Sequence, residues 1–130
     1  SSSKSSSEES KKSSQSNDAP FKIGEIANFK SGLSVTVNSI ENSSEEPNSP
    51  IKGHLVKLSF TIENKTGAAT NFNSHLVSLY DGKSLKANLD SKGFYSEEIA
   101  NGMRSTGVAY YDAANDGPYT AIVGAATFKQ

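Results

Sequence analysis

The amino-acid sequence predicts an all-β domain, an antiparallel β-sandwich of about seven or eight strands that follows a disordered N-terminal tail. Short stretches alternate apolar with polar residues, the pattern of a strand with one buried face. Glycine, asparagine, aspartate and proline separate these stretches at regular intervals. Only the stretch "FYSEEIANG", residues 94–102, resembles a short helix, ended by Asn101-Gly102. A small β-barrel shares this pattern and stays open as the alternative.

Residues 1–19 form a segment that is too polar to fold. Ten of the first sixteen residues are serine, and three lysines cancel three acidic residues over the segment. We expect a disordered tether over 1–19, with a root-mean-square span of about 25 Å, and a folded domain over 20–130. Such a start is similar to that of a mature bacterial lipoprotein cut just after its lipidated cysteine. The alternatives are a degradable remnant or a linker between domains.

The strongest strand prediction lies in "HLVKLSFTIEN", where polar residues separate four apolar ones. These four are expected to face the core together: Val56, Leu58, Phe60 and Ile62. An earlier strand, "LSVTVNSI", changes phase at Ile40, which indicates a β-bulge. The preceding "FKSGL" predicts a tight hairpin with Gly32 in the turn.

Three further stretches are expected to form strands and turns. Asp81-Gly82 separates two short apolar runs in residues 75–89 and predicts a hairpin, because this dipeptide readily takes positive φ. Residues 105–113 and 119–128 are rich in β-branched and aromatic residues and are joined across "ANDGP". Residues 39–50 are expected to form a mobile polar loop.

Composition excludes several classes of function. The formal net charge is −1, so no global field attracts nucleic acid or an anionic membrane. Cysteine is absent, which removes disulfides, thiolate nucleophiles and zinc-thiolate sites. There is no apolar run of about 18 residues that could span a bilayer. No export signal is recognisable, so we expect any such signal to have been removed before Ser1.

No motif predicts catalysis, a metal site or a cofactor. His54 and His75 are the imidazoles of the chain, and no catalytic or metal-binding spacing links them. We expect both to lie on the surface at strand ends. The stretch 112–117 faintly resembles a calcium loop but lacks the distal glutamate, and 82–84 lacks the upstream glycine of a phosphate loop. Both are interpreted as turns.

Five aromatic residues in the C-terminal third are the candidate binding residues: Phe94, Tyr95, Tyr110, Tyr111 and Tyr119. Tyr110 and Tyr111 must face opposite sides of a strand, so one is exposed if the other enters the core. Exposed tyrosine beside loops is common in binding surfaces because it offers rigid contact area. The alternative is that these rings cover sheet edges or pack in the core.

The order of several segments resembles a known family. "FKIGEIANFKSGLSVTVNSIE", "KGHLVKLSFTIENKTG", "LYDGK" and "GMRSTGVAYYDA" follow one another as in the telokin-like, immunoglobulin-fold domain of unknown function common in Gram-positive bacterial lipoproteins and secreted proteins. Its specific elements here are Gly53 through Asn64, and Gly107 at the start of a late strand. Asn101-Gly102 stands where the family usually has Pro-Gly. The resemblance implies an immunoglobulin-like sandwich that is lipid-anchored outside the cell, without a shared catalytic set.

The sequence therefore predicts a non-enzymatic, surface-tethered extracellular interaction module. Its expected partner is a protein or a cell-envelope component, and exclusion or immunity at the envelope is a role that the resemblance admits. We expect a monomer without nucleic acid or cofactor, held at the membrane only through a lipid anchor on a residue preceding Ser1, or secreted. One alternative is a small-ligand carrier or sensor with a cavity between the sheets. A hydrolase, with Ser or Asp near His54 or His75, is the other.

Overall fold

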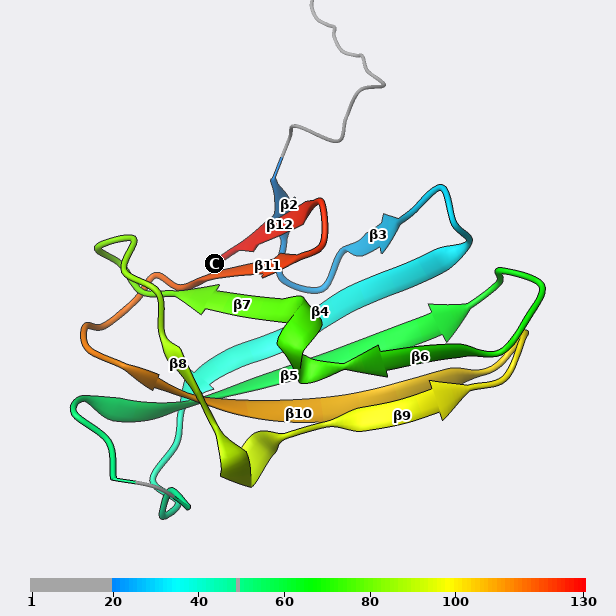
Figure 1. The fold of residues 1–130 in the computed structure, drawn as a ribbon. Coiled ribbons are helices and arrows are strands. Elements are labelled where there is room, and N and C mark those ends of the chain that lie inside the picture. Colours follow the sequence, from blue (N-terminus) through cyan, green and yellow to red (C-terminus); the bar gives the residue numbers. More distant parts are fainter. Residues whose placement is uncertain (1–19, 49) are drawn as a thin grey trace, which may run out of the picture.

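The domain is a β-sandwich whose two main sheets differ in strand length (Figure 1). The computed structural model describes residues 20–48 and 50–130; the expected tether over 1–19 lies outside these residues. Within this described part of the chain three sheets form, ordered β3-β4-β5-β10-β8, β2-β12-β11-β7 and β6-β9. All the strand pairs found there are antiparallel except β12 with β2. The all-β sandwich predicted from the sequence is therefore confirmed, with more and shorter strands than expected.

The strand bounds are β2 (Phe21–Lys22), β3 (Ile26–Asn28), β4 (Leu33–Asn42), β5 (His54–Asn64), β6 (Thr70–Asn73), β7 (Val77–Tyr80), β8 (Asn88–Asp90), β9 (Ser96–Ile99), β10 (Arg104–Ala113), β11 (Thr120–Val123) and β12 (Ala126–Lys129). Two short 3₁₀ turns, η2 (Ser74–Leu76) and η3 (Ser91–Gly93), precede β7 and β9. No helix among the described residues is long and apolar enough to cross a membrane.

The alternating pattern of β5 places its apolar residues in the core, as predicted. The four expected residues, Val56, Leu58, Phe60 and Ile62, have no exposed surface. They face the inner side of the four-stranded sheet, where Leu79 and Phe128 are equally buried. This quartet joins the two sheets into one core, because side chains of both inner faces pack between them.

The bulge and the hairpin predicted around β4 are both present. The pairing of β4 with β5 shifts between Val37 and Ser39, so that Ile40 returns to the core. In the β3–β4 turn, Gly32 has φ 104° and donates a backbone hydrogen bond to Phe29 O. The positive φ explains why glycine occupies this position.

The predicted helical turn at residues 94–102 is wrong. Residues Ser96–Ile99 form strand β9, which pairs with β6, and Ile99 is buried. Gly102, at φ 83°, forms the turn into β10. The pairing with β6 and the burial of Ile99 outweigh the helical propensity of the two glutamates, because tertiary packing overrides local preference.

The turn at Asp81-Gly82 forms, but for a different reason from the one predicted. Ser84 adopts the positive φ, 65°, and the carboxylate of Asp81 accepts hydrogen bonds from the backbone N–H groups of Lys83 and Leu85. A Cβ atom at Gly82 would lie 2.6 Å from Gly117 O, so close backbone approach selects this glycine. Beyond the turn the chain pairs briefly with β7 and then crosses to β10 as β8.

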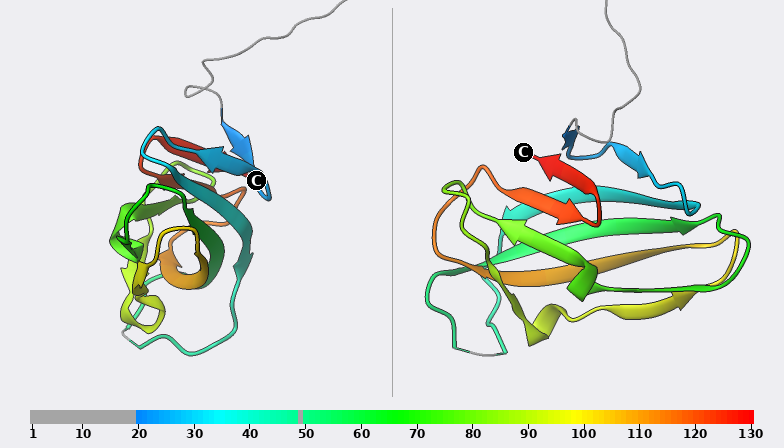
Figure 2. Two further views of the ribbon diagram at one scale, coloured as in Figure 1. Left: turned by 90° about the vertical axis from the view of Figure 1, so that its right-hand side faces the viewer. Right: turned by 45° about the horizontal axis from the view of Figure 1, so that its top comes forward.

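The stretch 119–128 forms two strands instead of one. β11 and β12 are joined by a tight turn in which Gly124 has φ 58°. β10 belongs to the five-stranded sheet, so the "ANDGP" connection passes from one sheet to the other (Figure 2).

The two sheets cover each other incompletely. β4, β5 and β10 have 10, 11 and 10 residues, whereas β7, β11 and β12 have 4 each. At about 3.3 Å per residue, the long strands extend roughly 20 Å beyond the short ones. The two-stranded β6–β9 sheet and η2 lie along part of this excess (Figure 1). The inner face of the long sheet therefore approaches solvent between η2 and the β3–β4 turn.

Candidate binding site

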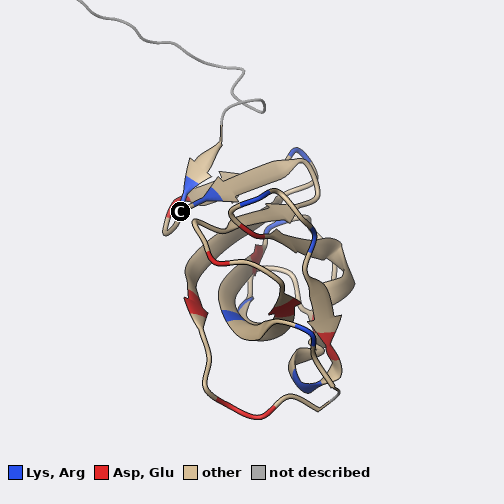
Figure 3. Cartoon of the chain, turned by 90° about the vertical axis from the view of Figure 1, so that its left-hand side faces the viewer, with Lys and Arg blue, Asp and Glu red and all other residues tan. Residues whose placement is uncertain are grey.

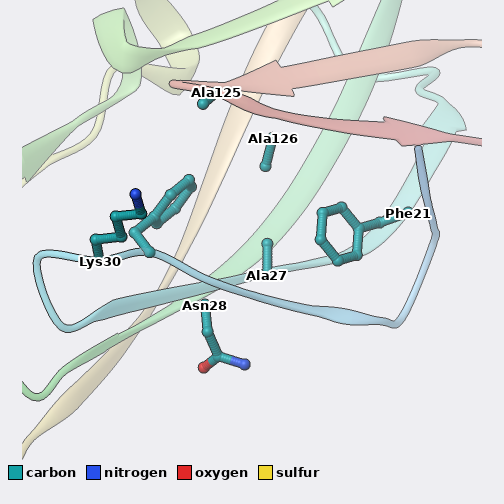
Figure 4. A pocket seen from close by; sticks show the side chains of 7 residues that line it. Phe21, Ala27, Asn28, Lys30, Ala125 and Ala126 are labelled. Atoms are coloured by element: carbon teal, nitrogen blue, oxygen red, sulfur yellow. The ribbon is translucent and has the colours of Figure 1, made fainter. Parts of the chain in front are cut away.

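Two apolar hollows lie where the short sheet ends, one on each side of Phe29. The first has a volume of about 300 Å³ and lies between β3 and the β11–β12 turn (Figure 4). Phe21, Ala27 and Ala126 point into it, and Lys30 is its charged residue. We call this hollow and the next one the Phe29 hollows.

The second hollow, of about 250 Å³, opens between η2 and the β3–β4 turn. Its lining is almost entirely apolar and includes Leu33, Val35, Phe72, Leu76 and Val123. It shares Phe29 and Ala125 with the first hollow. Leu76 is 50% exposed and places apolar surface at the rim.

Local backbone geometry holds Phe29 between the hollows. Phe29 N donates to Leu33 O at 2.8 Å and Phe29 O accepts from Gly32 N at 3.0 Å, so the turn that carries the ring is closed at both ends. The ring passes close to Gly124, where a Cβ atom would lie 3.9 Å from Phe29 Cε1. The positive φ of Gly124 produces the tight turn that leaves this space open.

The chemistry of the Phe29 hollows suits binding. Their lining is mostly apolar, with Asn28, Lys30 and Ser31 as its polar residues, so an apolar group entering them would lose contact with water without meeting a carboxylate. Each is about the size of the smallest ligand pockets, and both are open to solvent. One or two apolar side chains, or one small apolar molecule, would fill them.

Two of the five aromatic residues predicted for binding are buried. Tyr111 is 1% exposed and its hydroxyl donates to Val77 O at 3.1 Å, and this burial raises the pKa of Tyr111. Tyr119 is 4% exposed and its hydroxyl donates to Asn42 Oδ1 at 2.7 Å. Both rings therefore pack in the core and offer almost no free surface.

Tyr110 lies on the opposite face of β10 from Tyr111 and holds the β4–β5 loop. Its hydroxyl donates to Glu45 Oε2 at 2.6 Å, and this hydrogen bond lowers the pKa of Glu45. Lys92 approaches Glu45 Oε1 at 3.8 Å and lies over the Tyr110 ring. Asn48 N donates to the carboxylate of Asp90 in the same region. The loop that we expected to be mobile is thus fastened to β10 and η3.

Phe94 and Tyr95 lie beside η2, away from Tyr110. Phe94 is 51% exposed and packs against the ring of His75, with ring centres 5.2 Å apart. Tyr95 is half-buried over β10, and its hydroxyl donates to Ser105 Oγ at 2.6 Å. The five residues do not form one surface, and the binding role of the three with solvent exposure remains a prediction.

His54 is the imidazole that meets an acidic residue. Its Nε2 lies 2.7 Å from Tyr119 Oη and 3.8 Å from Asp116 Oδ1. The Tyr119 hydroxyl also donates to Asn42 Oδ1, so His54, Tyr119 and Asn42 form one hydrogen-bonded chain that links strand ends. Among residues 20–48 and 50–130, no three His, Asp or Glu side chains gather as a metal site.

The residues that carry the family resemblance support the backbone. A Cβ atom at Gly53 would collide with Ala113 O. At Gly107 it would lie 2.6 Å from the Tyr95 ring and 2.8 Å from that of Phe60. Asn64 is fully buried and forms hydrogen bonds with both ends of its amide. These motif residues therefore specify the fold.

Sequence reasoning did not identify the Phe29 hollows. Phe29 stands in a turn, "FKSGL", where an apolar ring has no obvious core to enter. That position is the available signal, because a large apolar residue in a tight turn is expected to pack on something nearby.

Comparison with known proteins identifies the family and the fold. Residues 21–129 match the family described as Domain of unknown function (DUF4352). A secreted protein from Mycobacterium tuberculosis, MPT63, is similar in structure, with TM-score 0.68, 15% identity and coverage of 86% of this chain and 97% of that one. The yjhA protein from Bacillus subtilis has TM-score 0.62, 24% identity and coverage of 79% of each chain.

A candidate lipoprotein from Bacillus subtilis, ycdA, has TM-score 0.58, 13% identity and coverage of 74% of this chain and 32% of that one. At these identities the likeness shows the fold, an immunoglobulin-like β-sandwich. Comparison with curated proteins finds no match.

Proposed function

From the premise that this chain belongs to the DUF4352 family of domains of unknown function, we propose that it is an extracellular binding module without enzymatic activity. It recognises a protein or another envelope component by taking up apolar groups in the Phe29 hollows. The observation that carries this proposal is the pair of solvent-open apolar hollows around one ring.

The energetics favour contact with a partner. Leu76 is half exposed and Phe29 is only partly buried, so both can lose further water contact. Burying one leucine-sized or phenylalanine-sized side chain contributes about 1.5–3 kcal/mol. Two such anchors, one in each hollow, form a binding centre of the kind that dominates protein interfaces.

The location outside the cell rests on separate observations. The fold is similar to that of a secreted protein and of a candidate lipoprotein. The serine-rich composition of residues 1–19 suits a tether to the membrane of a Gram-positive cell through a lipidated cysteine before Ser1. Detection of that cysteine by mass spectrometry of the full-length precursor tests the anchor.

The hollows can be tested by filling them. Ala125 lines both, so the bulky side chain of Ala125→Trp should obstruct the hollows where they meet without removing a core side chain. Ala69→Trp, at an exposed position before β6, is the matched control. Capture from envelope extracts by the full chain should yield a component that the control retains and Ala125→Trp loses. Equal capture by both variants would rule out the hollows as the site.

A small-ligand carrier is the second candidate, because the hollows lie between the sheets. Native mass spectrometry of the protein isolated from its host should then show a bound small molecule that Ala125→Trp lacks. A ligand-free protein that still captures an envelope component would leave the first proposal standing alone.

A further inference from the structure

The outer face of the four-stranded sheet has a charge distribution unlike the rest of the domain. Residues 20–130 contain ten basic and eleven acidic side chains. None of the eleven acidic residues lies in β2, β7, β11 or β12, the four strands of this sheet. Blue Lys/Arg segments lie on the strands beside the C terminus, and a red acidic segment lies in the loop at the opposite end of the view (Figure 3).

The strand register places three lysines of this face in one row. Successive cross-strand pairs connect the residues of the row. Across neighbouring strands, the order is Lys22, Lys129, Thr120, Tyr80 and Lys86, each paired with the next. Residues opposite each other in a sheet point to the same side, so all five side chains lie on one face. This face is the outer one, because the neighbouring residues Phe128 and Leu79 are buried between the sheets.

The row is wide enough for an extended polymer. Neighbouring strands lie about 4.8 Å apart, so Lys129 and Lys86 are separated by roughly 14 Å and Lys22 and Lys86 by roughly 19 Å. A shallow hollow of about 310 Å³ lies on this part of the face, lined by Tyr80, Ser84, Thr120, Ile122, Thr127 and Lys129. Its hydroxyl groups can hydrogen-bond a polyol between the charged positions.

The lysines of this row are available for a partner. The lysines that form ion pairs within the described residues are Lys65 and Lys92, which lie elsewhere. Glu25 lies in the turn after β2, and its carboxylate accepts a hydrogen bond from Lys22 N. Asp81 follows β7 but is buried, with its carboxylate held by Asn115 and backbone N–H groups.

We infer that this face, the lysine row, binds a linear polyol phosphate polymer of the cell envelope. Three separated cations on a flat surface match repeated anionic groups better than one small anion, which could reach only one end of the row. Lysine binds phosphate as a point charge, and the row contains no arginine, whose planar fork binds single carboxylate or phosphate groups in a bidentate manner. The choice of an envelope polymer as the ligand rests on the proposed extracellular location. The observed charge distribution of this face is independent of that proposal.

The test measures binding of an end-labelled synthetic glycerol phosphate oligomer to the full chain by fluorescence anisotropy. Each lysine removed should weaken binding about fivefold, and the triple variant Lys22→Gln/Lys86→Gln/Lys129→Gln on the order of 100-fold. The control Lys52→Gln/Lys57→Gln/Lys65→Gln changes the net charge equally on other surfaces and should retain most of the affinity. Added salt should weaken binding to the parent protein.

Several outcomes would overturn the inference. Equal losses in the two triple variants would show attraction by net charge alone. Equally tight binding of polygalacturonate or of single-stranded DNA would remove the assignment to a polyol phosphate. Binding to phosphatidylglycerol vesicles but not to the oligomer would assign the face to a membrane. This measurement does not depend on binding in the Phe29 hollows, so its failure would leave the proposed function untouched.

Discussion

Replacing Asn64 by alanine should destabilise the domain more than its small change in volume suggests. The Asn64 side-chain amide donates to Ile99 O and Ala68 O, both at 2.8 Å, and its carbonyl accepts from Thr66 N and Oγ1. Alanine would leave Ile99 O buried without this donor, at a cost of about 1–3 kcal/mol. The other three groups, Ala68 O, Thr66 N and Thr66 Oγ1, can reach water and add roughly 0.5–1 kcal/mol each. The expected loss is therefore about 2.5–6 kcal/mol.

The measurement is chemical or thermal denaturation of the parent and variant proteins. A loss of about 3 kcal/mol should lower Tm by roughly 10–15 °C for a domain of this size. Asn38→Ala is the matched control, because Asn38 is exposed and makes one hydrogen bond, to Thr61 Oγ1. It should change stability by no more than about 0.5 kcal/mol. A small effect of Asn64→Ala, or equal effects of both, would refute the reasoning.

Two further predictions concern packing and pH. Gly107→Ala should lower the free energy of unfolding by about 1–3 kcal/mol, measured by urea denaturation, because the new Cβ would press on the rings of Tyr95 and the fully buried Phe60. An unchanged urea concentration at the unfolding midpoint would show that these rings move freely. The hydrogen bond from Tyr110 lowers the pKa of Glu45. This contact therefore holds the β4–β5 loop at pH values above the ordinary glutamate pKa, and it is lost as the pH falls through the lowered pKa of Glu45. The backbone amides of that loop should lose protection from hydrogen exchange in acid, after correction for the intrinsic pH dependence of exchange. In the Tyr110→Phe variant they should be less protected already at neutral pH. Equal protection in the parent and variant proteins would contradict the role of this contact.

The local pattern predicted what each strand buries, but not which strands meet. The alternation in β5 requires Val56 through Ile62 to face one side, and the phase change at Ile40 requires a bulge. Nothing local states that β10 pairs with β5 while β11 joins the opposite sheet. The helical prediction at residues 94–102 failed for the same reason, because the partner of β9 lies at Thr70–Asn73.

The candidate site could not be predicted because it arises from a difference between sheets. Phe29 and Leu76 come from separate turns, and they face the same opening only because the strands of one sheet end early. In the four-stranded sheet, the lengths of β11 and β12 depend on the turn at Gly124. In the sequence of residues 119–128, this glycine is the one sign that the apolar stretch is divided into two strands. The lysine row has the same origin, since its members are distant in sequence and meet through register alone.

The parallel pairing of β2 with β12 determines when the domain can be completed. Within residues 20–48 and 50–130, β2 pairs with β12 alone, with Phe21 opposite Phe128, so the first described strand can pair only after the last one is available. Contacts of this sequence separation slow folding, because a long loop must close before they form. During synthesis the sandwich can therefore close only after nearly the whole domain has emerged from the ribosome, and the strand pair that completes it lies next to residue 20, where the described domain begins.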